Sequence, residues 1–209
     1  MNFVVKPDFL TSEDVEIIKS YEKPSIGEIQ NYHIKSVNDA VKGWSIMHDF
    51  NKTEVSKEVT QFQGEGTLVD EVPNYYRELG QRIADDVGIS SEHMFLQYIV
   101  IGSSGEIRKH YDAGKPGYVT YKCNVSVAGP QNDQIHVGDE VLPITLQGLY
   151  CFEANLYKHW MESSDIPRIH LSYGYILPYA TLGWEEDCPR VRLSNKIWKA
   201  YISRTTPDR

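Results

Sequence analysis

A histidine and an aspartate lie one residue apart in the segment KHYDAGKPGY, which runs from Lys109 to Tyr118. In an extended chain His110 and Asp112 project to the same side, because side chains alternate between the two sides of a strand. An imidazole nitrogen and a carboxylate oxygen on one side begin a set of two histidines and one carboxylate, which holds Fe(II) and leaves coordination positions open. A polar strand end before a turn has the same appearance, so the pair needs support from the rest of the chain.

A third ligand has to come from a distant part of the chain, and two histidines are candidates for it. His159 follows the strand-like run LYCFEA at 149–154 and precedes a loop, MESSDIP, that leads to Arg168. His170 lies on the same strand-like run as Arg168, where a contact to a bound ligand suits it better than metal coordination. We therefore expect His159 to complete the metal set, with His170 as the competing ligand.

The run RIHLSYGYIL at 168–177 alternates between two kinds of residue. Arg168, His170 and Ser172 fall on one face of an extended strand, and Ile169 and Leu171 fall on the other. A buried guanidinium without an anionic partner is very costly, so Arg168 predicts an anion in the interior. The far carboxylate of a small dicarboxylic acid that chelates the metal would meet this need with paired hydrogen bonds. The diacid that fits this description is 2-oxoglutarate.

Taken together, His110-x-Asp112, His159 and Arg168 resemble the motif of the Fe(II)/2-oxoglutarate-dependent oxygenase superfamily, which is HxD…H followed by a basic residue on the next strand. The resemblance extends over roughly 95–178. More narrowly, the segments YKCNVSVAGP, HVGDE and GLYCFEANLYKHWMESSDIPRIHLSYGYIL are similar to the aspartyl/asparaginyl β-hydroxylase group. The segment DFLTSEDVEIIK and the retained aspartate ligand resemble the prolyl-hydroxylase branch.

The resemblance implies a double-stranded β-helix, that is, a jelly-roll and cupin-like barrel, together with a set of site residues. Fe(II) would be held by His110, Asp112 and His159, and Arg168 would fix the far carboxylate of 2-oxoglutarate. The aspartyl/asparaginyl β-hydroxylase group also contacts 2-oxoglutarate through a polar pair on the strand after the first ligand, and this pair is usually Arg and His. The expected further contacts to the co-substrate come from Lys122, Asn124, His170, Tyr98 and Ser172.

The implied reaction uses Fe(II), 2-oxoglutarate and O2 to hydroxylate an unactivated C–H bond, with release of succinate and CO2. The implied substrate is an amino-acid side chain in a protein, a peptide or a free amino acid. The cofactors carry this chemistry and the protein places them, which agrees with a sequence that has no nucleophile motif and no nucleotide-binding glycine motif. Two rival functions stay open: a cupin-like metal enzyme that does not use 2-oxoglutarate, and a non-catalytic barrel that binds a ligand.

The elements that must position these residues are expected to form a single domain over 1–209. A helix is predicted at about 12–22, where Thr11 or Ser12 can cap a segment with acids in its first turn. A second helix is predicted at about 73–88, because Tyr76, Leu79 and Ile83 recur at helical spacing. From 94 to 178, short β-rich runs alternate with turn residues, which predicts a mainly β barrel with flanking helices.

The remaining segments carry weaker signals. The irregular region 24–70, with Trp44 and Phe50, is where we expect a substrate lid, since loops on a rigid barrel commonly serve binding. The C-terminal run RLSNKIWKAYISR predicts a basic amphipathic helix packed on the outside of the barrel. Glu153 and Glu162 are expected to be exposed to solvent.

Composition excludes several classes of function. The net charge of -8 disfavours a nucleic-acid substrate, because the field of the chain repels phosphate. No run approaches the roughly 18 apolar residues that a membrane span needs. The cysteines are odd in number and lack C-x-x-C spacing, which is typical of a reducing compartment. We therefore expect a cytoplasmic, soluble intracellular protein.

Overall fold

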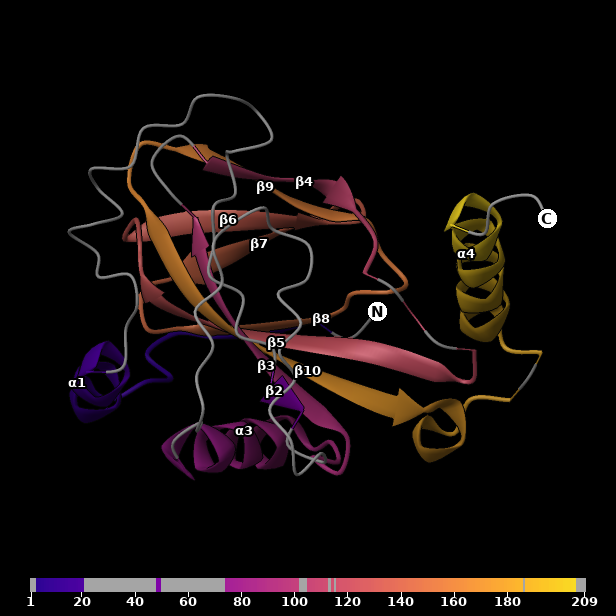
Figure 1. Cartoon of the computed structure of the whole chain (residues 1–209), viewed down its shortest axis with the longest axis horizontal. Helices are drawn as coiled ribbons and strands as arrows, with labels where there is room; N and C mark the ends of the chain where they lie inside the picture. The colour runs from indigo at the N-terminus through magenta and orange to yellow at the C-terminus, as the bar shows by residue number, and fades with distance from the viewer. Residues whose placement is uncertain are drawn as a thin grey trace.

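Two antiparallel β-sheets dominate the computed structural model, which describes residues 3–20, 48–49, 74–101, 105–112, 114, 116–185 and 187–205 (Figure 1). The larger sheet contains, in spatial order, β1 (Val4–Lys6), β8 (Leu149–Glu153), β5 (Tyr118–Ala128), β10 (Arg168–Pro178), β3 (Met94–Ile101) and β2 (His48–Asp49). The smaller sheet contains β4 (Gly105–His110), β9 (His159–Ser164), β6 (Asn132–Val137) and β7 (Glu140–Thr145). The described helical elements are α1 (Ser12–Ser20), α3 (Asn74–Val87), η1 (Tyr179–Leu182) and α4 (Pro189–Thr205).

The two sheets face each other across a hydrophobic layer. Ile99 and Phe152 of the larger sheet pack there with Ile135 and Met161 of the smaller one. A second cluster lies on the outer side of the larger sheet, where α1 and α3 cover it (Figure 1). The structure is therefore mainly β with flanking helices, as the sequence predicts. None of the helices in the described ranges is long and apolar enough to span a membrane.

Strand β10 contributes side chains to both faces of the larger sheet. Leu171, Tyr173 and Tyr175 are fully buried in the outer cluster beside the helices. His170 and Ser172, which alternate with them, line a cavity between the sheets. Because side chains of a strand alternate between its two faces, one segment supplies both the support for the helices and the wall of the cavity.

Helix α3 is fixed to the sheet by two phenols. The hydroxyl of Tyr173 donates to the carbonyl oxygen of Tyr76 at 2.7 Å, and that of Tyr175 donates to the carbonyl oxygen of Gly80, also at 2.7 Å. A Cβ atom at Gly80 would lie 2.8 Å from the ring of Tyr173. Glycine at this position therefore lets the helix approach the sheet closely.

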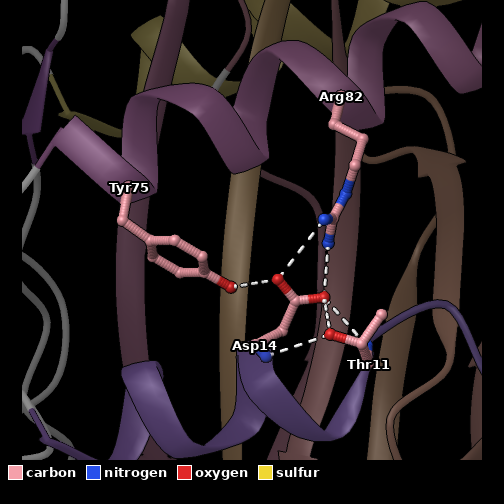
Figure 2. Close-up of polar contacts among 4 residues, drawn as sticks. All are labelled: Thr11, Asp14, Tyr75 and Arg82. Carbon is pink, nitrogen blue, oxygen red and sulfur yellow. Dashed lines mark hydrogen bonds and ion pairs between the residues drawn. The ribbon is translucent and has the colours of Figure 1, made fainter.

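Helices α1 and α3 are joined by a buried carboxylate (Figure 2). Asp14 accepts hydrogen bonds from the backbone N–H of Thr11 at 2.8 Å and from the hydroxyl of Tyr75 at 2.8 Å, and Nη2 of Arg82 lies 2.8 Å from Oδ2. Thr11 in turn accepts the N–H of Asp14, which forms a reciprocal cap at the start of α1. Burial opposes the charge, but these partners, led by Arg82, lower the pKa of Asp14 to about 2. This acid is fully satisfied by the protein.

Helix α4 packs beside the barrel, with contacts near its start. Val191 belongs to the outer core, and Ser194 lies 3.4 Å from the side-chain nitrogen of Asn155. Nη1 of Arg190 lies 3.2 Å from Oε1 of Glu153. Glu153 is only 3 % exposed, so the expectation that it faces solvent is wrong. Burial raises the pKa of Glu153, and Arg190 opposes that rise.

The predicted substrate lid at 24–70 lies outside the described residues, apart from the two residues of β2. Glu162, in contrast to Glu153, is exposed as expected, and it accepts a hydrogen bond from the indole N–H of Trp160 at 3.2 Å.

Candidate metal centre

Three ligand-type side chains converge at one end of the smaller sheet. His110 is the last residue of β4 and His159 is the first residue of β9, and the two are direct neighbours in the antiparallel register. Asp112 follows β4 by two residues and is held by its backbone N–H, which donates to the carbonyl of Ala154 at 3.1 Å. One donor atom from each of the three side chains lies within 4.8 Å of the others. The pairing of β4 with β9 thus brings together residues that lie far apart in the sequence.

The orientation of both imidazoles is set by backbone carbonyls. Nδ1 of His110 lies 2.6 Å from the carbonyl oxygen of Arg108, and Nδ1 of His159 lies 3.2 Å from that of Tyr157. A carbonyl oxygen only accepts hydrogen bonds, so Nδ1 carries the proton in each ring. In the neutral rings the lone pair is therefore on Nε2, as a metal ligand requires.

Both Nε2 atoms face the same carboxylate oxygen. Oδ1 of Asp112 lies 3.3 Å from Nε2 of His110 and 3.6 Å from Nε2 of His159. Three lone pairs directed at one another repel, so this arrangement needs a cation or a proton among them. The donor set of two imidazoles and one carboxylate fits Fe(II). Burial disfavours charge on the ring of His110, but the hydrogen bond to Asp112 raises its pKa above the usual value.

Lys122 is the cation nearest to the second oxygen of Asp112 in the described part of the chain. Its Nζ lies 3.2 Å from Oδ2, within ion-pair distance, although Oδ2 receives no hydrogen bond of good geometry. Burial opposes ionisation of Asp112, but Lys122 and then the two histidines hold the pKa of this carboxyl well below its usual range. The carboxylate is therefore ionised and ready to bind a metal.

A small cavity of about 50 Å³ extends from these ligands into the barrel. Its wall includes four of the residues that the sequence assigns to the co-substrate, namely Lys122, Asn124, His170 and Ser172. Oγ of Ser172 and Nε2 of His170 are buried and have no hydrogen-bond partner among the described side chains and backbone. Because buried polar groups are nearly always paired in folded proteins, these two atoms indicate a polar ligand in this cavity.

The register of β10 explains which residues share this wall. Ser172 is paired with Asn124 of β5 on one side and with Gln97 of β3 on the other. Tyr98 is paired with Leu171 instead. In the backbone register Gln97 lies in the row of Ser172 and Asn124, and Tyr98 lies in the adjacent row, so the contact predicted for Tyr98 stays a prediction.

Arg168 is buried, at 2 % exposure, but it already has an anionic partner. Its Nε lies 2.6 Å from Oδ2 of Asp133, and its Nη2 lies 3.0 Å from Oδ1 of the same residue. Its Nη1 donates to the carbonyl of Gly105 at 3.3 Å. Arg168 thus has the anionic partner that a buried arginine requires. This partner, Asp133, belongs to the opposite sheet and was not identified from the sequence.

The Arg168–Asp133 ion pair lies near the cavity wall without lining the cavity. Its two charges act on Tyr150 and on His170, both of which form the cavity wall. Burial lowers the pKa of His170 to about 4, so this imidazole is neutral near pH 7. Nδ1 of His170 lies 3.5 Å from the hydroxyl of Tyr150, so Nε2 is the nitrogen that can donate to a ligand or accept from it.

Tyr150 and Phe152 line the cavity and were not identified from the sequence. They alternate in the run LYCFEA, so they share one face of β8, and Tyr150 pairs with Asn124 in the register. This alternation could have identified both residues as lining the cavity. Nothing in the sequence, by contrast, connects Asp133 with Arg168.

Comparison with solved structures supports the fold. The crystal structure of a Pseudomonas putida prolyl-4-hydroxylase matches with a TM-score of 0.50 and 10 % identity over 84 % of this chain and 92 % of that chain. A viral collagen prolyl hydroxylase from Paramecium Bursaria Chlorella virus-1, in complex with 2-oxoglutarate, matches with a TM-score of 0.49 and 8 % identity over 85 % and 96 %. No family model and no curated protein matches the sequence.

At such identity the likeness concerns the fold alone. Together with the two facing sheets, the match to the Pseudomonas protein confirms the double-stranded β-helix predicted from the sequence. The chain has the fold of a prolyl-4-hydroxylase, and it carries a His-Asp-His cluster.

Proposed function

We propose that this chain is an Fe(II)- and 2-oxoglutarate-dependent oxygenase that hydroxylates an amino-acid side chain of a protein, a peptide or a free amino acid. The observation that carries the proposal is the convergence of His110, Asp112 and His159 beside a buried cavity with unpartnered polar atoms. The fold adds support, because it is shared with a prolyl-4-hydroxylase.

His110, Asp112 and His159 would hold Fe(II) through two nitrogens and one oxygen. When bound, the metal supplies the oxidising chemistry: one O2 and one 2-oxoglutarate give succinate, CO2 and one oxygen atom that enters a C–H bond of the substrate. The residues of the chain bind and orient. The carbonyls of Arg108 and Tyr157 keep Nε2 of each histidine available, and the hydrophobic layer between the sheets excludes water.

The cavity residues would hold 2-oxoglutarate. Asn124, Ser172 and His170 offer polar groups along its wall, and Arg168 lies behind this wall, paired with Asp133. The cavity volume is small, so a bound diacid would displace side chains that now line it, and Lys122 is long enough to move aside. For Arg168 to hold the far carboxylate, that carboxylate has to displace Asp133 from the guanidinium or bind the guanidinium together with Asp133.

The second candidate is a cupin-like metal enzyme that does not use 2-oxoglutarate. The pairing of Arg168 with Asp133 favours it, because a guanidinium with an internal partner does not require an external anion. Both candidates use the same metal ligands, so the co-substrate distinguishes them.

Succinate formation tests the proposal directly. Purified protein with Fe(II), 2-oxoglutarate and O2 is expected to release succinate even without the prime substrate, and Asp112→Ala is expected to abolish this release. Asp139→Ala, which removes an exposed acid from the turn between β6 and β7, is the matched control and should retain it. Metal binding without succinate from the wild type would favour the cupin-like alternative.

A further inference from the structure

A second and larger cavity, of about 590 Å³, lies on the other side of the metal ligands. His110 and Asp112 line both cavities, so a ligand in the larger one would contact the metal centre directly. Its far wall is helix α4, which lies off the end of β4 (Figure 1). A volume of this size is typical of sites for ligands larger than a single amino acid.

The wall of the larger cavity is basic although the chain is acidic. The sequence has 21 Lys and Arg against 29 Asp and Glu, so an average part of its surface is acidic. The lining includes Lys109, Lys158 and Lys196, and the acid among its described residues is Asp112, which belongs to the metal centre. The local charge is therefore opposite in sign to that of the whole chain.

The three lysines are not neutralised by acids of the described residues. Nζ of Lys109 lies 3.9 Å from the ring centre of Trp160, and Nζ of Lys158 lies 5.7 Å from that of Tyr111. Such contacts orient an ammonium group but leave its positive charge in place. No described carboxylate lies within ion-pair distance of either residue or of Lys196.

Apolar groups lie among these charges. Leu193 is 38 % exposed and Tyr111 is 36 % exposed, and Ile197 lines the same cavity. Exposed apolar side chains bordered by charges are typical of binding sites. The pattern fits a partner that presents both apolar side chains and carboxylates.

We propose that this cavity, between α4 and the metal ligands, binds an acidic peptide segment as the substrate to be hydroxylated. The inference rests on the proposed function, because it names the substrate class of the same site. Carboxylates of the peptide pair with Lys158 and Lys196, and an apolar side chain packs on Leu193 and Ile197. The residue to be oxidised then lies beside His110 and Asp112, opposite the cavity assigned to 2-oxoglutarate.

Binding is measured by fluorescence anisotropy with three labelled peptides of equal length. Glutamate alternates with alanine and leucine in the first, and glutamine or lysine replaces the glutamate in the other two. Two or three partly exposed ion pairs, each worth about a factor of two to three in affinity, predict that the acidic peptide binds about tenfold more tightly than the glutamine peptide. Added salt is expected to reduce this difference, because exposed charges are screened.

Two variants of the same helix provide the matched comparison. Lys196→Glu is expected to remove the preference for the acidic peptide. Lys199→Glu changes the net charge equally, at an exposed position of α4 that does not line the cavity, and should keep the preference. Equal loss in both variants, or no preference in the wild type, would overturn the proposal.

The same peptides separate this inference from the proposed function. Anisotropy needs no turnover. A Lys196-dependent preference for the acidic peptide without succinate formation would therefore support peptide binding in the larger cavity and refute the oxygenase function. Succinate formation that is accelerated equally by all three peptides would support the oxygenase and refute the acidic substrate class.

Discussion

Two buried carboxylates of this chain have opposite surroundings. Asp14 is surrounded by donors from two helices and has no bonding capacity left for a ligand (Figure 2). Asp112 faces two imidazole lone pairs with one oxygen, and its other oxygen receives no hydrogen bond of good geometry from the part of the chain that the structure describes. Both acids have a lowered pKa, so a pKa shift alone does not distinguish them. Asp14 is saturated by hydrogen-bond donors, whereas Asp112 keeps one oxygen directed at two nitrogens that can bind a metal, and this difference separates the structural acid from the candidate metal ligand.

The largest effect is expected at Asp112. Asp112→Asn replaces a charged ligand of the proposed metal set by a neutral one, and should weaken metal affinity by more than about 100-fold, since even outer partners of metal ligands are worth 10–100-fold. Titration of Mn(II) into the protein, followed by the rise in Tm that metal binding produces, measures this. An unchanged rise in Tm would show that the cluster is not the metal site.

The Arg168–Asp133 pair differs from both acids. Its charges satisfy each other within the chain, but the pair adjoins the cavity proposed for 2-oxoglutarate. If 2-oxoglutarate takes the place of Asp133, Arg168→Ala should weaken its binding by roughly 10- to 100-fold, the value of one or two charge-assisted hydrogen bonds. Asp133→Asn removes the competitor and should strengthen binding. Calorimetric titration of 2-oxoglutarate into the Mn(II)-loaded protein measures both.

Both variants disturb a buried ion pair and are expected to lower stability, so the titration is carried out at a temperature where circular dichroism shows each to be folded. If neither variant changes the affinity, Arg168 is structural, and Lys122 becomes the residue to test next.

Asp14→Asn should affect stability and leave metal binding intact. It breaks a pair in which Asp14 is buried but Arg82 is 45 % exposed. The cost is therefore expected to be about 2 kcal/mol, below the 3–5 kcal/mol of a fully buried pair. Urea unfolding monitored by circular dichroism gives the free energy of unfolding, and a change below about 0.5 kcal/mol would contradict the role assigned to this acid.

The stabilisation by Asp14 should also appear in the pH dependence of the free energy of unfolding. The pKa of Asp14 is lowered from 3.8 to about 2 in the folded chain, so the unfolded chain binds its proton more readily. The stabilisation is present above pH 3.8 and is lost as the pH falls towards 2. Over this range, urea midpoints of the wild type should fall more steeply than those of Asp14→Asn, and parallel curves would contradict the assignment.

Tyr75→Phe is expected to have the smallest effect. It removes one hydrogen bond of 2.8 Å to Asp14 and leaves the other donors in place. Because a hydrogen bond to a charged group is worth somewhat more than a neutral one, the expected loss is about 1–2 kcal/mol. The urea experiment measures it, with Tyr157→Phe, a tyrosine far from this cluster in the sequence, as the control.

Sequence reasoning was effective where the signal is local. The spacing of His110 and Asp112 and the alternation of Arg168, His170 and Ser172 are local patterns. The structure places His110 at the end of β4, Asp112 two residues beyond it, and the other three residues on the strand β10. Helix α1 begins at Ser12, where capping residues were identified. Such features depend on neighbours in the sequence, which any reader of the chain can see.

The features that sequence reasoning missed depend on contacts between distant elements. Asp133 is 35 residues from Arg168 and lies in the other sheet. Glu153 is buried because α4, from the end of the chain, covers it with Arg190. The larger cavity exists for the same reason, since its far wall is that helix. These properties follow from the packing of elements whose relative position no local pattern contains.

The two phenols that join β10 to α3 have a consequence for how the cavity can change. Tyr173 and Tyr175 bond to carbonyls one helical turn apart, so the helix can neither slide nor rotate against the strand without losing both bonds. The backbone of β10 is thereby held from its outer side, whatever occupies its inner side. Substitutions at 170 and 172 can alter what the barrel accepts while the strand keeps its path, which makes this inner face the natural place for new ligand preferences to evolve.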